Sequence, residues 1–170
     1  MRLKLALLCL CFTYGLAHPH IFIDTKVGVE KDKIIITWVF DEMSSSMLIV
    51  DYDKNKNKVL EQNEIDFMEK DHFKPLATYN FFSALVENDT EKKIKTYTAF
   101  GAFIEKGRLN YHFEIPKPQA KLYEIHFYDP EMYVALLVNK KDVKCYSGAT
   151  CKSAGYDADF YYGYKVMVKE

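Results

Sequence analysis

The sequence predicts an α+β fold that is mostly β, in which antiparallel, sandwich-like sheets carry one helical insert. Apolar and polar residues alternate along residues 21–29, which is the period of a strand with one buried face. Many short segments rich in β-branched and aromatic residues follow residue 80, and two helical patterns, over residues 43–50 and about 62–79, separate them from the first strands. No repeat or low-complexity linker divides the sequence, which indicates one domain.

The first two strands should form a hairpin. A polar turn at residues 31–33 separates the first strand from residues 34–40, which are rich in β-branched side chains. Further strands are expected over residues 81–87, 94–105, 108–115, 122–128, 133–138 and 160–168.

The helical insert should contain two helices. A short helix is expected over residues 43–50, opened either by Asp41 or by the serines that follow it. The second should run from Gln62 to about Tyr79 and be interrupted at Pro75, because proline has no N–H to donate within a helix.

The loop between these helices resembles the calcium-binding loop of an EF-hand. Alternate oxygen ligands on such a loop converge on one hard cation, and a final glutamate closes the coordination sphere. Its candidate ligands are Asp53, Asn55, Asn57, the Val59 carbonyl, Glu61 and Glu64. Lys58 stands where glycine normally makes the sharp turn, and two asparagines reduce the negative charge. Any calcium affinity should therefore be weak, and a hydrated polar loop that caps the next helix remains the alternative.

The first 17 residues have the pattern of a cleavable signal peptide. Arg2 and Lys4 supply a positive start, residues 5–16 are almost wholly apolar, and small residues precede the cut after Ala17. An uncleaved anchor is the less favoured alternative, because about a dozen apolar residues are fewer than the roughly 20 that a span needs. We therefore expect a single periplasmic domain, residues 18–170, with no stable membrane insertion after cleavage. The net charge of −1 gives no strong basic field for nucleic acid.

Cys145 and Cys151 are the two cysteines that remain after cleavage. In an oxidising compartment, two cysteines this close in sequence should form a disulfide. A pair of thiolate metal ligands is the alternative, although the spacing is not Cys-x-x-Cys.

The mature chain would begin His18-Pro19-His20. If the first strand extends back this far, both histidines share a face with Asp24, and imidazole, amine and carboxylate suit Zn²⁺, Ni²⁺, Co²⁺ or Cu²⁺. Pro19 lacks an amide proton, which excludes a square-planar site built on two deprotonated amides and leaves a clamp of the α-amine and an imidazole. A frayed terminus with incidental histidines is the alternative.

A second candidate metal site lies in a predicted hairpin over residues 108–128. If Ile115 paired with Lys121, His112 would face Glu124, with His126 diagonal to it. The polar outer face of a sheet would produce the same pattern. His72 stands alone on the second helix and is expected at the surface.

Several segments carry a resemblance to a known family. They are His18 to Asp24 (HPHIFID), Trp38 to Glu42, the loop Asp53 to Glu64, Tyr79 to Phe82, and Tyr128 to Pro130 with Tyr133. In this order they resemble the bacterial "domain of unknown function 1007" family over nearly the whole chain after residue 17. The resemblance implies a periplasmic component of a metal transport system, acting beside a nickel/cobalt-type permease and in some members in zinc uptake.

The resemblance also bears on individual residues. It implies that His18 and His20 are the prime ligands and that the EF-hand-like loop is a family trait. This loop departs from the family pattern of aspartates and glycines, which lowers the expectation of bound calcium. The remaining family residues are expected to fill the core or stabilise turns: Trp38, Phe40, Asp41, Tyr128, Asp129 and Tyr133.

The leading functional hypothesis is a periplasmic accessory protein that binds a divalent transition metal, Zn²⁺, Ni²⁺ or Co²⁺, and assists an inner-membrane metal permease. The alternative is a calcium-stabilised structural or interaction module without a transport role. An enzyme is not expected, because the sequence has no Ser/His/Asp or Cys/His motif.

Overall fold

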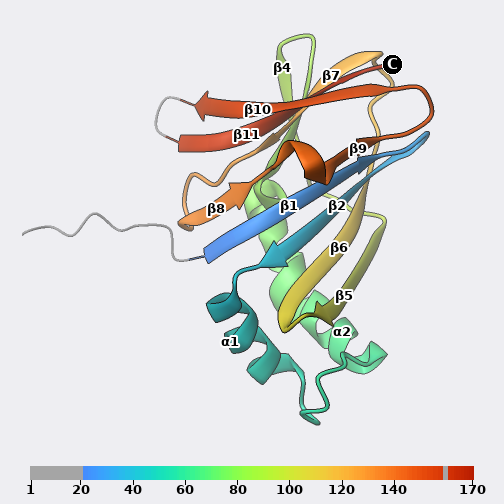
Figure 1. The fold of residues 1–170 in the computed structure, drawn as a ribbon. Helices are drawn as coiled ribbons and strands as arrows, with labels where there is room; N and C mark the ends of the chain where they lie inside the picture. Colours follow the sequence, from blue (N-terminus) through green and yellow to red (C-terminus); the bar gives the residue numbers. More distant parts are fainter. Residues whose placement is uncertain (1–20, 159–160) are drawn as a thin grey trace, which may run out of the picture.

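The structure, a computed structural model, describes residues 21–158 and 161–170. The predicted signal peptide and the predicted ligands His18 and His20 lie outside these residues. The described chain forms two β-sheets with a helical insert at one end (Figure 1). The predicted fold class, α+β and mostly β, is confirmed.

The first sheet, sheet A, has the order β5-β6-β2-β1-β8, and β9 also pairs with β1. Its strands are β1 (Ile21–Val29), β2 (Lys33–Phe40), β5 (Ala99–Glu105), β6 (Arg108–Pro116), β8 (Val134–Leu137) and β9 (Val143–Cys145). The predicted hairpin of β1 and β2 is confirmed, with Ile23 opposite Phe40. The pairings of β1 with β8 and β9 are parallel, so this sheet is mixed rather than purely antiparallel.

The second sheet, sheet B, has the order β10-β11-β7-β3-β4. Its strands are β3 (Ser83–Glu87), β4 (Thr90–Lys93), β7 (Leu122–Phe127), β10 (Thr150–Ala158) and β11 (Tyr161–Lys169). The long strand β10 was not predicted, because its residues include lysine, serine, glycine and aspartate and give no alternating apolar pattern. β10 pairs with β11 along its whole length, and these pairings hold it as a strand although its own sequence does not indicate one.

The helical insert begins with α1 (Glu42–Tyr52) and α2 (Gln62–Met68). The chain then continues through a π-helical turn, η1 (Glu69–Phe73), and a 3₁₀ segment, η2 (Lys74–Phe82). Pro75 does not interrupt the helical path as predicted, because it stands in the first turn of η2, where its missing N–H costs no hydrogen bond. The path bends instead at Asn80 and Phe81, which both have positive φ.

Phe73 is the centre of the aromatic core between the insert and sheet A. Its ring centroid lies 5.9 Å from that of Trp38, 4.9 Å from that of Phe113 and 4.4 Å from that of Phe100. Apolar side chains of sheet B, among them Ile125 and Val166, belong to the same buried cluster. The insert is therefore held to the sheets by one continuous core.

The predicted disulfide between Cys145 and Cys151 is present. Cys145 ends β9 in sheet A, and Cys151 lies near the start of β10 in sheet B. The bond therefore links the two sheets directly. Among the described residues, no helix is both long and apolar enough to cross a membrane.

Candidate functional site

The start of β1 and the start of α1 meet at Asp41. Its carboxylate accepts hydrogen bonds from the main-chain N–H of Phe22 at 2.9 Å and from that of Ser44 at 2.8 Å. Asp41 is thus the N-cap of α1, one of the two predicted alternatives, and it also ties that helix to the first described strand. Burial alone would raise the pKa of Asp41, but the donors from Ser44 and Phe22 together hold it below its ordinary value.

Asp24, a predicted ligand, lies on the outward face of β1. Its carboxylate forms an ion pair with Arg108, with 3.0 Å between Oδ2 and Nη1. Arg108 also donates to the carbonyl oxygen of Val39 at 3.0 Å, so the guanidinium is held in place by the backbone of β2. A fixed positive group at this distance competes with any cation for the Asp24 carboxylate.

An apolar pocket of about 470 Å³ lies beside α1, next to the start of β1. It is lined by Ile21, Phe40, Met43, Ser44, Met47, Leu48, Asp51 and His72. None of these described lining residues is a lysine or an arginine. In the described part of the chain, the wall of this pocket, called the α1 pocket below, therefore has no lysine or arginine that would repel a metal ion. Figure 1 shows α1 close to the first residues of β1.

His72 is not a free surface histidine as predicted. It is partly buried, and its Nδ1 lies 2.8 Å from the hydroxyl oxygen of Tyr111, a residue of β6 that is fully buried. Burial lowers the pKa of His72 against the opposing effect of the Asp71 carboxylate, so the imidazole is neutral at pH 7. The aromatic sequence neighbours of His72 gave no indication of this contact, because its partner is 39 residues away.

In the EF-hand-like loop, the carboxylates at the first and last template positions both turn inward. Asp53 is 3% exposed and Glu64 is 5% exposed. Asp53 accepts main-chain hydrogen bonds from Asn57 at 3.2 Å and from Lys58 at 2.9 Å. Glu64 accepts them from Lys54 at 2.8 Å and from Glu61 at 3.0 Å. The loop therefore winds around its own acidic side chains.

The other predicted loop ligands stabilise local turns. The side-chain oxygen of Asn55 accepts from the N–H of Asn57 at 2.9 Å, and that of Asn57 accepts from the N–H of Val59 at 2.8 Å. Glu61 forms a capping box with Glu64 at the start of α2. Lys58 has a φ of 64°, the left-handed conformation that glycine usually supplies at this position.

The predicted second metal site in a hairpin of residues 108–128 is wrong. His112 lies in β6 of sheet A, opposite Thr37 and Gly101, whereas Glu124 and His126 lie in β7 of sheet B. The segment after Pro116 crosses from one sheet to the other instead of turning back, so His112 and Glu124 do not face each other.

Glu124 and His126 are nevertheless neighbours on β7. Oε2 of Glu124 lies 2.7 Å from Nε2 of His126. Oε1 of Glu124 accepts a hydrogen bond from Nζ of Lys165 at 3.0 Å. Burial alone would raise the pKa of Glu124, but these two partners together hold it below its ordinary value. The carboxylate is already neutralised by the lysine, which makes it a poor ligand for an added cation.

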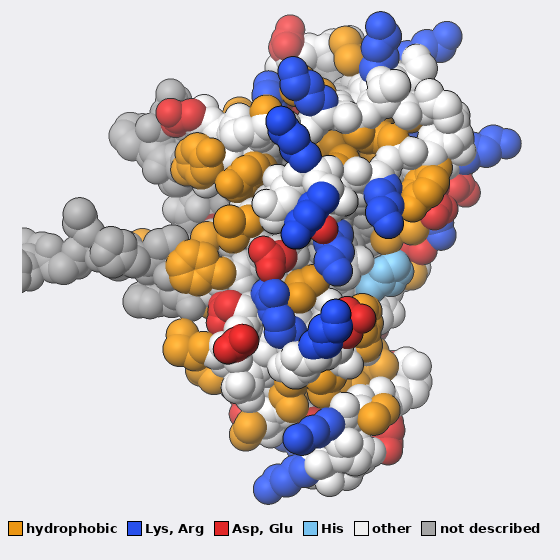
Figure 2. All heavy atoms as spheres, viewed as in Figure 1, with side chains coloured by type: hydrophobic (Ala, Val, Ile, Leu, Met, Phe, Trp, Pro, Cys, Tyr) orange, Lys and Arg blue, Asp and Glu red, His pale blue; other side chains and the backbone are white. Residues whose placement is uncertain are grey.

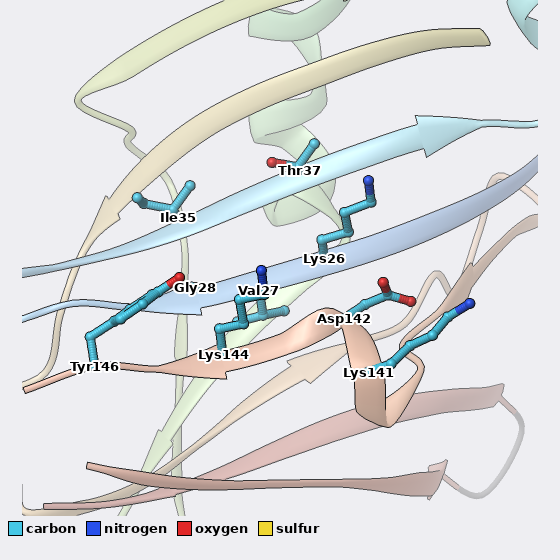
Figure 3. Close-up of a pocket in the computed structure, with 9 residues that line it drawn as sticks. All are labelled: Lys26, Val27, Gly28, Ile35, Thr37, Lys141, Asp142, Lys144 and Tyr146. Atoms are coloured by element: carbon cyan, nitrogen blue, oxygen red, sulfur yellow. The ribbon is translucent and has the colours of Figure 1, made fainter. Parts of the chain in front are cut away.

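A second pocket, of about 260 Å³, lies on the outer face of sheet A. Figure 3 shows Lys26 on β1, with Lys141, Asp142 and Lys144 on the adjoining segment of η3 (Lys140–Asp142) and β9. Lysine and arginine side chains gather on this face of the molecule, interspersed with fewer acidic ones (Figure 2). Three lysines against one aspartate make this pocket unsuitable for a cation.

Within residues 21–158 and 161–170, no group of three or more histidine, cysteine, aspartate or glutamate side chains is close enough to hold a metal ion. Met43, Met47, Asp51 and His72 all border the α1 pocket, whose described lining includes no lysine. The sequence interpretation did not single out the two methionines. Their spacing of four residues within a predicted helix was the available signal.

The predictions that certain family residues stabilise turns or fill the core are confirmed in part. Asp129 accepts from the N–H groups of Glu131 at 2.9 Å and Val134 at 2.7 Å, and Trp38 is fully buried. Tyr133 is exposed, so its predicted place in the core is wrong.

The fold and these sites define a small two-sheet domain with a helical insert, beside which Met43, Met47, Asp51 and His72 line an apolar pocket. The chain belongs to the family described as "Protein of unknown function (DUF1007)", which it matches over residues 3–160. It is 27% identical over 168 residues to an "Uncharacterized protein" of Haemophilus influenzae (strain ATCC 51907 / DSM 11121 / KW20 / Rd). That match covers 91% of this chain and 80% of the relative. No solved structure matches the chain.

Proposed function

We propose that the protein is exported to the periplasm and binds a divalent transition metal, Zn²⁺, Ni²⁺ or Co²⁺, which it delivers to an inner-membrane metal permease. The observation that carries the proposal is the sequence His18-Pro19-His20 directly before β1. Cleavage after Ala17 would free an α-amine beside the first imidazole, and amine and imidazole are good ligands for these ions. The protein acts in this proposal as a binding protein and not as an enzyme.

Two structural facts support a role for this segment. Residue 21 is the first of a strand that pairs on both sides, with β2 and with β8, so the segment is attached to a rigid element of sheet A. Ile21 also lines the α1 pocket, whose described lining residues include no lysine or arginine. The Cys145–Cys151 disulfide suits an oxidising compartment.

The test is a calorimetric titration of protein that begins at His18 with Zn²⁺, Ni²⁺ and Co²⁺. The His18→Ala/His20→Ala double variant should lose the tightest binding, and a variant with two extra residues before His18 should bind more weakly because it lacks the amine beside the imidazole. His112→Ala is the matched control, because it removes a histidine of β6 that lies far from His18 and His20 in the sequence. Equal binding by the double variant and the wild type would end the proposal.

The permease partnership needs a separate measurement. Cells that express a metal permease with this protein should accumulate more zinc, nickel or cobalt than cells with the permease alone. The His18→Ala/His20→Ala variant should remove that difference at equal protein levels. Accumulation that is unchanged by the protein would leave metal binding without a transport role.

We infer a second candidate function, a calcium-stabilised structural or interaction module, from the loop between α1 and α2. The observation in its favour is the near-complete burial of Asp53 and Glu64, whose hydrogen bonds come from main-chain N–H groups. Both carboxylates are at template positions whose oxygens would coordinate a Ca²⁺ ion. Calcium should raise the melting temperature of the wild type, and Glu64→Ala should abolish the rise while Glu42→Ala preserves it.

A further inference from the structure

The α1 pocket contains a set of soft donors that the proposed N-terminal clamp does not use. Its lining includes the thioethers of Met43 and Met47, the imidazole of His72 and the carboxylate of Asp51. We propose that this pocket is a binding site for Cu(I), with Met43, Met47 and His72 as its ligands. The site is independent of His18 and His20, and it would exist even if the terminal histidines bound nothing.

The two methionines lie on one face of α1. They are four residues apart, which places their side chains on successive turns of the same face of the helix. They are 63% and 64% exposed, so packing does not account for their presence on this face. Each has a flexible, unbranched side chain, which allows two sulfur atoms to converge on one ion.

The helix that carries these methionines is held firmly. Asp41 caps its first turn, and the hydroxyl of Ser45, fully buried, donates to the carbonyl oxygen of Phe40 at 3.2 Å. The same hydroxyl accepts from the N–H of Leu109 in β6 at 3.0 Å. The backbone that carries the two methionines is therefore fixed before an ion arrives.

His72 has the arrangement of a metal-ligating histidine. Its Nδ1 is turned toward Tyr111 behind the wall of the pocket, at 2.8 Å. Nε2, on the opposite side of the ring, is therefore the nitrogen that can coordinate an ion in the pocket. When Nδ1–H donates a hydrogen bond to the Tyr111 hydroxyl oxygen, Nε2 keeps its lone pair for a metal ion, and such an outer hydrogen bond fixes both the tautomer and the ring orientation. Tyr111 is thus a positioning residue.

The donor set selects the ion. Thioether sulfur is a soft, uncharged ligand that favours Cu(I) over Zn²⁺, Ni²⁺ or Ca²⁺, and imidazole also suits copper. The apolar remainder of the wall, formed by Ile21, Phe40 and Leu48, suits an ion of low charge. Asp51 at the rim can balance that charge without acting as a ligand.

The experiment measures Cu(I) affinity under anaerobic conditions by competition with a chromophoric Cu(I) chelator. It uses the mature protein, residues 18–170, with His18→Ala/His20→Ala in every sample so that terminal binding is removed. Met43→Leu/Met47→Leu, which conserves side-chain volume, should weaken Cu(I) binding at least about tenfold, and His72→Gln should do the same. Tyr111→Phe should weaken it about 10- to 100-fold while it keeps the buried ring.

Matched controls exclude general damage to the protein. Met167→Leu changes a methionine of β11 in sheet B, and Tyr97→Phe removes a tyrosine hydroxyl that donates to Glu69 instead of contacting His72. Both should leave Cu(I) affinity unchanged. X-ray absorption of the Cu(I)-loaded protein should show copper–sulfur scattering that the double leucine variant loses.

The two proposals fail separately. Loss of Zn²⁺, Ni²⁺ or Co²⁺ binding without loss of Cu(I) binding would contradict only the proposed N-terminal clamp. A double leucine variant that folds normally and retains full Cu(I) affinity would overturn the Cu(I) site, and the exposed methionines would then be assigned to docking of an apolar partner.

Discussion

The carboxylate of Asp41 accepts a hydrogen bond from the main-chain N–H of Phe22 at 2.9 Å, so one side chain joins the start of β1 to the start of α1. Asp41 follows directly on β2, and the same carboxylate caps α1 through Ser44. The end of the first hairpin, the first helix and the strand that continues from His18-Pro19-His20 are thereby held at one point. The α1 pocket lies on this junction.

Replacing Asp41 with alanine should lower the free energy of unfolding by about 1–2 kcal/mol. The substitution removes the cap of α1 and leaves the N–H of Phe22 without its acceptor. Urea denaturation followed by circular dichroism measures the loss. Asp41→Asn should retain part of the stability because asparagine also caps helices, and Asp32→Ala in the exposed turn should cost little. An Asp41→Ala variant as stable as Asp32→Ala would contradict this role.

The contribution of Asp41 should also depend on pH. Its pKa in the folded protein is lower than its ordinary value, so its stabilising effect is present above the unfolded pKa and disappears as the pH falls through the folded pKa. The difference in unfolding free energy between wild type and Asp41→Asn should be constant above about pH 5 and should decrease below about pH 4. Chemical denaturation across this range tests the sign, and a difference that grows as the pH falls would refute it.

Lys58 tests the backbone of the EF-hand-like loop. Because its φ of 64° is unfavourable for a side chain with a Cβ, Lys58→Gly should raise the free energy of unfolding by about 1 kcal/mol without calcium. Lys58→Gln removes the same charge but keeps the strain, so it should not stabilise the protein. Both variants should bind Ca²⁺ more tightly than the wild type, since each removes a positive charge from the loop. Thermal melts with and without Ca²⁺ distinguish the two effects, and equal stability of the two variants would argue against strain at Lys58.

The disulfide should stabilise the contact between the two sheets. Cys145→Ser/Cys151→Ser should lower the free energy of unfolding by about 2 kcal/mol, the value expected for a short closed loop. A reducing agent should lower the stability of the wild type by a similar amount and leave the double serine variant unchanged. Free thiols detected in the oxidised wild type would show instead that the pair remains reduced, as the thiolate alternative requires.

Much of the fold could be predicted because it follows from local patterns. The alternation in residues 21–29 and the β-branched residues of β2 identified the first hairpin, and Asp41, one of the two expected starts of α1, is its N-cap. The close spacing of Cys145 and Cys151 led to the correct disulfide. These features depend on residues near one another in sequence, where the spacing of side chains decides the geometry.

The errors have a common physical origin. The hairpin predicted over residues 108–128 failed because β6 pairs instead with β5, directly before it in the sequence, and with β2, which lies far from it in the sequence. Strand β10 was missed because its extended conformation is stabilised by pairing with β11 and is not signalled by an alternating apolar pattern in its own sequence. Strand pairing depends on which apolar faces can be buried together, and a single segment does not contain that information.

The sequence by itself determined the mostly β class, the helical insert, the disulfide and the order of ligand-type residues along the chain. Only the tertiary structure decided which of those residues meet. It separated His112 from Glu124, paired Asp24 with Arg108, and brought His72 to Tyr111 beside two exposed methionines. The physical reason is that a binding site needs donors from several elements at one place, and that place is set by the packing of the insert against sheet A around Phe73.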